Sequence, residues 1–401
     1  MAGGVKLKNE CVENKQVGEL CGLIYNKPLL SMTSTFNINE DFGGSCIENS
    51  PKIPVSVRDM YSTFKDCRNL KESPVIPSRV RYMEYTFYGC TSLTQAPQIP
   101  SSVISMIATF SYCVSMVDPS IIPQNVAEIR NVYQGCSSLK YAPKILANAT
   151  DMTGVFDGCS NLIEAPEILE GITNMSFAFR GCRSLKKMPK IPEGVTNMAA
   201  TFEGCRSLTE VTKIPSTVTN MYCTFRKCIN LMEAPEIPEG ITNMSCTFMD
   251  CANLRKMPEI PTGVKVMAGT FGNCTNLKET TVIPSSVTSM LGTFSGCTSL
   301  KNAPIISEGI TDMEAAFAYC SNLKEFPQIP KSVENMLNTF YDCYSLRGEL
   351  IINSQSVSNI QSCFHKISND LIVKVPSNST TYENVMKEYG TSENITIQTF
   401  K

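Results

Sequence analysis

The chain has 401 residues with a formal net charge of −2, and 42% of them are hydrophobic while 18% are charged. Such a composition can bury a core, which excludes a disordered polymer. The near-zero net charge excludes binding to nucleic acid or an anionic membrane through the overall charge of the protein. The chain has no run of ~18 apolar residues, which excludes a membrane-inserted helix.

The N-terminal segment, residues 1–30, lies outside the repeats and is expected to be a cap or a docking segment. Its first ten residues lack the apolar stretch of a signal peptide. Either the chain is not exported by that route, or the sequence begins after the signal. Cys11 and Cys21 could close a small loop in this segment.

Residues 31–366 are expected to form a solenoid, because the chain repeats every 23 residues without insertion or deletion. The repeat is marked by a row of cysteines: Cys67, Cys90, Cys113, Cys136, Cys159, Cys182, Cys205, Cys228, Cys251, Cys274, Cys297, Cys320 and Cys343. Met32 and Phe36 suggest an irregular first coil, and Ile360 and Phe364 suggest a last one. About fifteen coils at ~4.8 Å spacing would make a rod roughly 70 Å long.

Residues 191–213 illustrate one coil, whose template is I-P-x-x-V-T-x-M-x-x-T-F-x-x-C-x-x-L-x-x-A-P-x. Proline recurs twice in most coils, which excludes a pair of packed helices. The β-branched and aromatic stretch V-T-x-M-x-x-T-F predicts a strand, and the stretch from Leu to the second Pro predicts a more irregular extended segment. The x-Gly-Cys and Pro-Glu-Gly pieces predict turns.

We call each position within the 23-residue repeat a slot. Two further slots are apolar in every coil, so that their residues form rows of the kind that a stacked core requires. The Phe row is Phe64, Phe87, Phe110, Tyr133, Phe156, Phe179, Phe202, Phe225, Phe248, Phe271, Phe294, Phe317 and Phe340. The Leu row is Leu70, Leu93, Met116, Leu139, Leu162, Leu185, Leu208, Leu231, Leu254, Leu277, Leu300, Leu323 and Leu346.

Residues 367–401 follow a different pattern and are expected to form a C-terminal β-α-β cap. Residues 371–376 predict a strand and residues 394–400 another. Between them, Thr380 and Glu383 have the spacing of a capping box that opens a short helix, and Gly390 is expected to end it.

The string V-T-x-M-x-x-T-F-x-x-C-x-x-L, followed by I-P, resembles the BspA-like bacterial leucine-rich repeats over about residues 30–365. Residues 195–198 and 201–202 are also similar to the repeats of mycoplasma-type surface lipoproteins. The resemblance implies a leucine-rich repeat fold and a surface-exposed role in adhesion or recognition, with no catalytic residues. Similar repeats occur in bacteriophage proteins, so a phage-encoded member is a second expectation.

The nineteen cysteines raise the questions of disulfides and of metal. Stacked cysteines lie within nominal disulfide reach, but their side chains run parallel and their slot suits a small buried thiol. We therefore expect reduced, buried thiols, which favours a reducing or anaerobic setting. No C-x-x-C pair occurs and His365 is the single histidine, so we expect no metal site and no cofactor.

Catalytic motifs are also missing: the chain has no G-x-S-x-G, H-E-x-x-H or phosphate-cradling glycine loop. Acidic residues such as Glu233, Glu236 and Glu259 recur at coil spacing. Paired carboxylates can hydrolyse glycosides, but a solvated polar face accounts for these. We expect no enzyme.

Two clusters of variable residues are candidate binding sites. The first is basic and near the middle of the array: Arg180, Arg183, Lys186, Lys187, Lys190 and, one coil on, Lys213. Its positive charge would suit an acidic partner surface or an anionic glycan. The alternative is a basic face that is only solvated.

The second cluster is aromatic and centres on Tyr85 and Tyr88, with Tyr61, Tyr82 and Tyr112 nearby. Exposed tyrosines are typical of protein interfaces and of platforms that stack on sugars. The alternative is that these rings pack at the edge of the surface.

The sequence thus predicts a non-enzymatic recognition or adhesion scaffold that presents a long repeat surface to a protein or glycan. The expected location is the bacterial cell surface or the extracellular space. The alternative is a structural subunit of a larger assembly such as a phage virion, in its tail or associated with its capsid.

Overall fold

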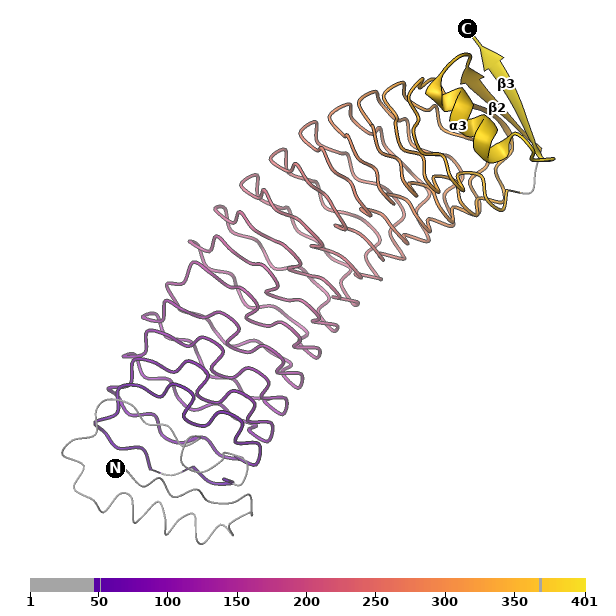
Figure 1. The fold of residues 1–401 in the computed structure, drawn as a ribbon. Coiled ribbons are helices and arrows are strands. Elements are labelled where there is room, and N and C mark those ends of the chain that lie inside the picture. Colours follow the sequence, from indigo (N-terminus) through magenta and orange to yellow (C-terminus); the bar gives the residue numbers. More distant parts are fainter. Residues whose placement is uncertain (1–46, 51, 368–369) are drawn as a thin grey trace, which may run out of the picture. The chain divides into compact units, whose positions relative to one another are not determined.

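The computed structural model describes residues 47–50, 52–367 and 370–401 (Figure 1). The chain divides into two compact units, Met1–Leu169 and Glu170–Lys401, here called the N-terminal and the C-terminal unit. The segment 1–30 and the irregular first coil predicted at Met32 and Phe36 lie outside the described residues. Among the described residues, no helix has the length and apolar character needed to cross a membrane.

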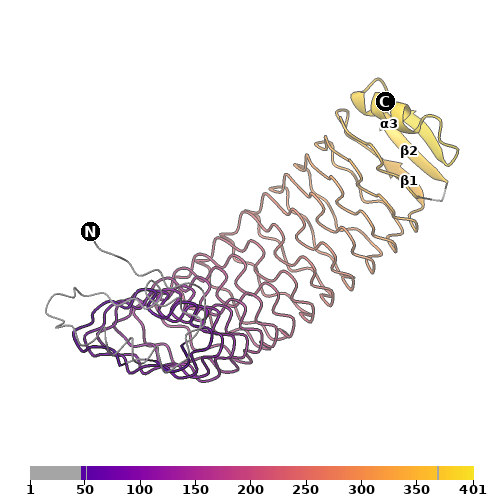
Figure 2. The same cartoon turned by 60° about the horizontal axis from the view of Figure 1, so that its bottom comes forward.

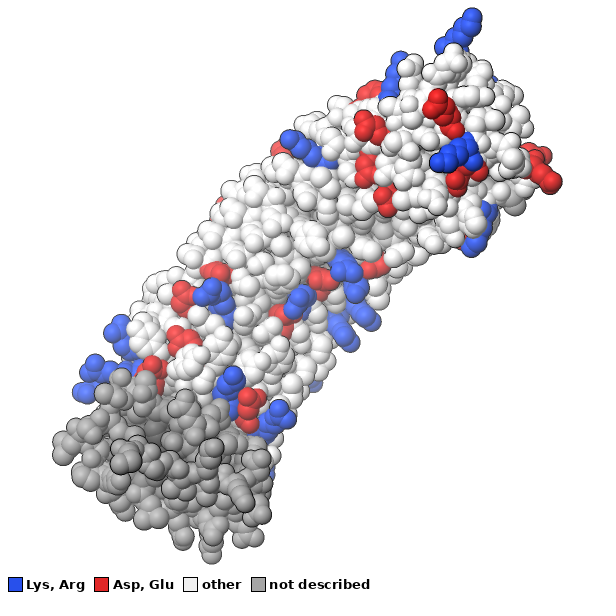
Figure 3. All heavy atoms as spheres, viewed as in Figure 1, with Lys and Arg blue, Asp and Glu red and all other residues white. Residues whose placement is uncertain are grey.

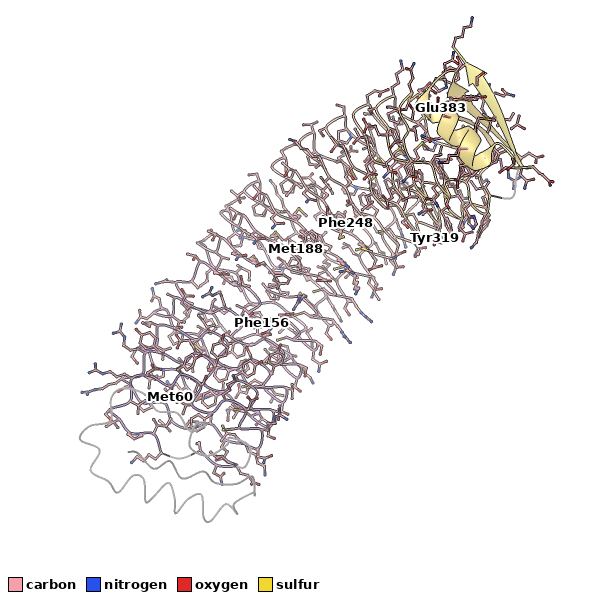
Figure 4. The ribbon with its side chains drawn as sticks, viewed as in Figure 1. Met60, Phe156, Met188, Phe248, Tyr319 and Glu383 are labelled. Atoms are coloured by element: carbon pink, nitrogen blue, oxygen red, sulfur yellow. The ribbon has the colours of Figure 1, made fainter. Side chains whose placement is uncertain are left out.

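Each unit is a stack of coils that wind around a core of inward-facing rows. Figure 2 looks partly along the first coils of the N-terminal unit and shows them as closed loops. A Met row joins the predicted rows: Met60, Met83, Met106, Ile129, Met152, Met175, Met198, Met221, Met244, Met267, Met290, Met313 and Met336. The predicted burial of the Phe, Cys and Leu rows is confirmed, and Phe248 in Figure 4 is one fully buried example.

The strand predicted over V-T-x-M-x-x-T-F is wrong, because only the residue before Met forms a bridge and the four residues after Met form turns. In one coil Ala200 and Gly204 have φ values of 51° and 74°, so the chain turns through the left-handed region twice. Alternate amides of this segment donate to the following coil, as Phe202 N does to Thr224 O at 2.9 Å. The intervening amides bond locally, as Thr201 N does to Met198 O at 3.1 Å.

Buried threonines and cysteines hold successive coils together through their polar atoms. Thr224 Oγ1 donates to Met198 O at 2.8 Å, and Cys228 Sγ donates to Phe202 O at 3.1 Å. Both bonds span 26 residues and recur in other coils. The Cys row therefore does more than fill space, since each of these thiols binds a carbonyl of the preceding coil.

Three slots in the coil form isolated parallel bridges to the next coil. One slot precedes the Met row, as in Asn197↔Asn220; one lies two residues after the Leu row; and one is the Ile of the Ile-Pro pair. An asparagine in the first slot accepts the backbone N–H two residues on, as Asn243 Oδ1 does from Ser245 N at 2.8 Å. This turn accounts for the recurrent Thr-Asn-Met element.

The C-terminal end carries the regular elements among the described residues. They are β1 (Gly348–Ile351), β2 (Leu371–Pro376), α3 (Thr380–Tyr389) and β3 (Ile395–Phe400). The strands are parallel in the order β1-β2-β3, with Leu350 beside Val373 and Val373 beside Ile397. The strand–helix–strand order predicted for residues 371–400 is confirmed.

The predicted capping box of Thr380 and Glu383 at the start of α3 is wrong, because the third residue after the N-cap is Tyr382, which cannot bond back as Glu or Gln does. Ser379, not Thr380, is the N-cap, and its hydroxyl accepts from Tyr382 N at 3.0 Å. Ser379 is the last extended residue before the helix, which is the geometry that an N-cap needs. Gly390 ends the helix as predicted.

Helix α3 supplies polar side chains to backbone groups of the last coil. Tyr389 Oη accepts from Phe364 N and donates to Ile360 O, both at 3.2 Å. Thr381 Oγ1 accepts from Val357 N at 3.0 Å. In earlier coils the backbone N–H of the Phe-row residue donates to a carbonyl of the next coil. At Phe364 the acceptor is instead Tyr389 of α3, so the helix replaces the next coil as hydrogen-bond partner. The boundary at residue 367 and the capping role of 367–401 stay predictions.

Replacing Tyr389→Phe is expected to lower the free energy of unfolding of the C-terminal unit by about 1–3 kcal/mol, because two buried backbone groups lose their partner. Urea unfolding followed by circular dichroism measures the change. Tyr382→Phe is the matched control, since Tyr382 lies half-buried on the same helix. Equal effects of the two variants would contradict the capping role.

Candidate functional site

The outward residues around the Met row differ from coil to coil, although the Met row itself hardly varies. We call the residues one before, one after and two after each Met-row position the Met-side face. In the N-terminal unit this face carries a depression of about 760 Å³, here called the tyrosine groove. Its lining residues are Asp59, Tyr61, Tyr82, Glu84, Tyr85, Ile107, Arg130, Asn131 and Thr153.

A line of tyrosine ring contacts begins at Tyr61 and Tyr85 in this groove and continues outside its lining to Tyr88 and Tyr112. The ring centroids of Tyr61 and Tyr85 are 5.9 Å apart, those of Tyr85 and Tyr88 are 5.9 Å apart, and those of Tyr88 and Tyr112 are 5.3 Å apart. Tyr82 lines the same groove. The structure therefore brings together the tyrosines that the sequence singled out.

The edge of this line carries charged neighbours. Lys65 Nζ lies 5.3 Å from the ring centroid of Tyr88. Burial, with smaller contributions from Tyr112 and Asp66, raises the pKa of Tyr88 above its ordinary value of 10.0. Like any tyrosine it is neutral at physiological pH, and its hydroxyl can donate a hydrogen bond.

Charged groups in the groove were not singled out in the sequence. Asp59 Oδ1 accepts from Tyr61 N at 2.8 Å, and Arg130 Nη2 lies 3.2 Å from Glu128 Oε2. Glu84 also lines the groove. These residues are scattered along the chain, but each precedes or follows a Met-row residue by one position. Aligning the coils slot by slot is the signal that could have found them.

The predicted basic cluster is spread over different slots. Arg180 follows the Phe row, where its guanidinium lies 4.8 Å from the ring centroid of Phe177. Lys187 forms an exposed ion pair with Glu210 at 3.7 Å. Arg183, Lys186, Lys190 and Lys213 are also exposed, the last two in a shared slot before the Ile-Pro pair. The cluster is a set of separate cations.

A second basic feature becomes visible only when the coils are stacked. Five consecutive coils of the C-terminal unit place an exposed cation directly after the Leu row, and we call them the basic column: Arg255, Lys278, Lys301, Lys324 and Arg347. Members of the column in successive coils are direct neighbours, since Lys324 N donates a hydrogen bond to Lys301 O at 3.1 Å. The sequence interpretation missed it because its members are a full coil apart along the chain.

Charge on the visible surface is otherwise mixed. On the face drawn in Figure 3, basic and acidic side chains lie beside one another, without a broad field of one sign. Mixed charge agrees with the net charge of −2 and limits long-range electrostatic attraction. The local features that stand out on this surface are the tyrosine groove and the basic column.

A family profile covers the repeats that build these faces. The profile of the "BspA type Leucine rich repeat region (6 copies)" matches residues 60–186, 152–266, 199–314, 242–372 and 292–400. The chain belongs to the BspA-type leucine-rich repeat family. The predicted leucine-rich repeat solenoid is thereby confirmed.

Solved structures of two leucine-rich repeat proteins are similar to this BspA-type chain. A leucine-rich repeat protein from Bacteroides ovatus is 21% identical with a TM-score of 0.55, over 88% of this chain and 91% of its own, and it shares the fold. A leucine-rich cell surface protein from Faecalibacterium prausnitzii is 21% identical with a TM-score of 0.44, over 78% of this chain and 81% of its own. No curated protein matches this chain significantly.

The thiols of this BspA-type protein are poor candidates for chemistry. Burial raises the pKa of Cys67, Cys297 and Cys343 to about 12, and that of Cys90 and Cys113 well above the ordinary value of 9.0. A protonated, buried thiol is neither a nucleophile nor a metal ligand. The sixteen cysteines in the described part of the chain form no disulfide, and no cluster there of three His, Cys, Asp or Glu could hold a metal ion.

Proposed function

We propose that this protein is a non-enzymatic recognition scaffold whose variable outward slots bind a macromolecular partner. The observation that carries the proposal is the contrast between slots. The inward Met, Phe, Cys and Leu rows repeat with little change, whereas the outward residues beside them differ from coil to coil. A surface that varies on a constant frame suits recognition, because each coil can add a different contact.

Family membership supports the same proposal. Leucine-rich repeat proteins generally bind macromolecules, and the BspA-type family is typically non-catalytic and located at the cell surface. By that analogy we place this chain at the bacterial surface or outside the cell. Its partner is a protein or a glycan. Finding the native chain only inside phage particles would instead favour the alternative of a virion subunit.

The basic column and the predicted basic cluster are the parts of this surface suited to an acidic partner. Residues in adjacent ladder positions with the same charge repel one another, so the column costs stability in the free protein. A bound anionic group relieves that repulsion. Among the described residues no ion pair involves a member of the column.

We expect the triple variant Lys278→Glu, Lys301→Glu, Lys324→Glu to bind polyglutamate, a probe for an acidic protein surface, at least about tenfold more weakly than the parent chain. The triple variant Lys186→Glu, Lys187→Glu, Lys190→Glu tests the predicted cluster in the same way. Isothermal titration calorimetry measures both affinities.

The control for these reversals is a variant with the same change in net charge at scattered positions. This control is the triple variant Lys52→Glu, Lys144→Glu, Lys387→Glu, in which all three replaced lysines are exposed. If the control weakened binding as much as the column variant, the attraction would be a matter of net charge alone. If neither basic triple changed the affinity, the proposed basic contacts would be wrong.

A further inference from the structure

We propose that the tyrosine groove binds an extended, uncharged polysaccharide, with one sugar unit facing each coil. The inference rests on the proposed role as a recognition scaffold and names a ligand class for one of its faces. Its support comes from the exposure of the rings, the repeat distance of the coils and the balance of charge.

The rings offer apolar surface with polar edges. Tyr61 and Tyr82 line the groove and are 54% and 39% exposed, and the ring of Tyr85 lies beside that of Tyr61 in it. A sugar presents C–H groups on one face and hydroxyls around its rim. Aromatic rings pack against the first while phenol oxygens and neighbouring side chains bind the second.

The coil repeat matches the size of one sugar. In the N-terminal unit the stacked rings of the Phe row are 5.4 Å apart between Phe64 and Phe87 and 5.5 Å apart between Phe87 and Phe110. This repeat is close to the length of one pyranose unit in an extended chain. The groove draws its lining from consecutive coils, from Asp59 to Thr153, so successive sugars would meet equivalent slots.

The charges of the groove nearly balance, which argues for a neutral ligand. Asp59 and Glu84 are opposed by Arg130, which is itself paired with Glu128, and exposed Arg81 lies in the slot before Tyr82. Carboxylates accept hydrogen bonds from hydroxyls, and guanidinium groups donate to them. A ligand rich in hydroxyls uses both kinds of group, whereas a charged polymer would meet repulsion from one of them.

Two of the tyrosines occupy strained backbone positions. Tyr85 and Tyr112 have φ values of 55° and 60°, in a region that bulky residues seldom adopt. Two of the equivalent slots nearby hold glycine, Gly154 for Tyr85 and Gly135 for Tyr112. A Cβ atom on Gly135 would lie 2.6 Å from Cδ1 of Tyr112, so glycine there leaves room for the ring. The equivalent positions are left-handed in other coils too, as at Ala108 and Ala200, so the conformation belongs to the coil and is not specific to tyrosine.

The test titrates the full chain with neutral β-linked oligosaccharides of increasing length, using cello- and manno-oligosaccharides as probes. Tyrosine fluorescence reports binding, because the chain has no tryptophan, and calorimetry gives the affinity. We expect the affinity to rise with each sugar until the groove is filled. Tyr61→Ala should weaken binding about tenfold. Tyr344→Ala, also 54% exposed but in the C-terminal unit, should leave it unchanged.

Three outcomes would overturn the inference: no binding of either probe series, an affinity independent of chain length, or equal losses for Tyr61→Ala and Tyr344→Ala. Steep weakening by added salt would point to a charged ligand and also overturn it. Polyglutamate binding by the basic column in a chain that binds no neutral glycan would leave the proposed function intact and remove only this inference.

Discussion

Raising the pH from 9 toward 12 is expected to unfold the protein, with each buried Cys-row thiol removing about 1.4 kcal/mol of stability per pH unit. In the folded chain the pKa of Cys67, Cys297 and Cys343 is raised to about 12 by burial, from an ordinary value of 9.0. The unfolded chain loses these protons near pH 9, while the folded chain keeps them.

The direction of the effect follows from which state binds the protons. Between the two pKa values the folded state holds more protons than the unfolded state, so stability falls as the pH rises. The contribution of each of these thiols is fully present below pH 9 and is lost by about pH 12. Because domains are stable by only about 5–15 kcal/mol, a few thiols acting together are enough to unfold them within that window.

Urea midpoints measured by circular dichroism between about pH 8 and pH 11, in a phosphine reductant, give the slope. The double variant Cys297→Ala, Cys343→Ala should reduce the loss of unfolding free energy by about 3 kcal/mol per pH unit above the ordinary thiol pKa. The reason is that two thiols, which titrate in the unfolded chain but not in the folded one, have been removed. Thr293→Ala is the control, because it removes a buried side chain that bonds Met267 O without removing a thiol, and it should leave the slope unchanged.

The comparison between variants removes the background from lysines and tyrosines, whose titration is common to all of them. A slope that did not differ between the parent chain and the double variant would mean that the thiols are accessible to water in the folded state. It would also contradict the hydrogen bonds that Cys297 and Cys343 donate to Phe271 O and Phe317 O.

The repeat, its buried rows and the elements near the C-terminus could be predicted from the sequence because each depends on residue type at a fixed period. The path of the chain between the rows could not. Val, Thr and Phe favour strands, yet the segment turns at Ala200 and Cys223, whose φ values are 51° and 54°. Neither residue type signals a left-handed conformation, which the contacts between coils impose.

The candidate sites were predictable to different degrees for a similar reason. Tyr85 and Tyr88 stand out because aromatic residues are dense in that stretch, but Asp59 and Arg130 join them only through the stacking of distant coils. Charge density along the chain indicated a cluster around Lys187, which is paired with Glu210. Proximity across coils matters more for the surface than proximity in sequence, and it is seen only slot by slot.

The second large effect is expected in the Phe row, where Phe248→Ala should lower the free energy of unfolding by about 3–5 kcal/mol. Phe248 is fully buried, and its ring stacks at 5.6 Å from Phe225 and 5.8 Å from Phe271. The variant loses both contacts and leaves a cavity that the neighbouring coils cannot close, because their hydrogen bonds fix the coil spacing.

The matched control is Phe177→Ala, the same replacement on an exposed ring of the same unit. It removes one contact with Arg180 and should cost less than about 1 kcal/mol. Hydrogen exchange adds a local measurement. Since each coil touches only its neighbours, protection should fall most between Phe225 and Phe271 and least near Phe340. Uniform loss of protection across the unit would mean that its coils unfold as one block, and the nearest-neighbour account of this stack would then be wrong.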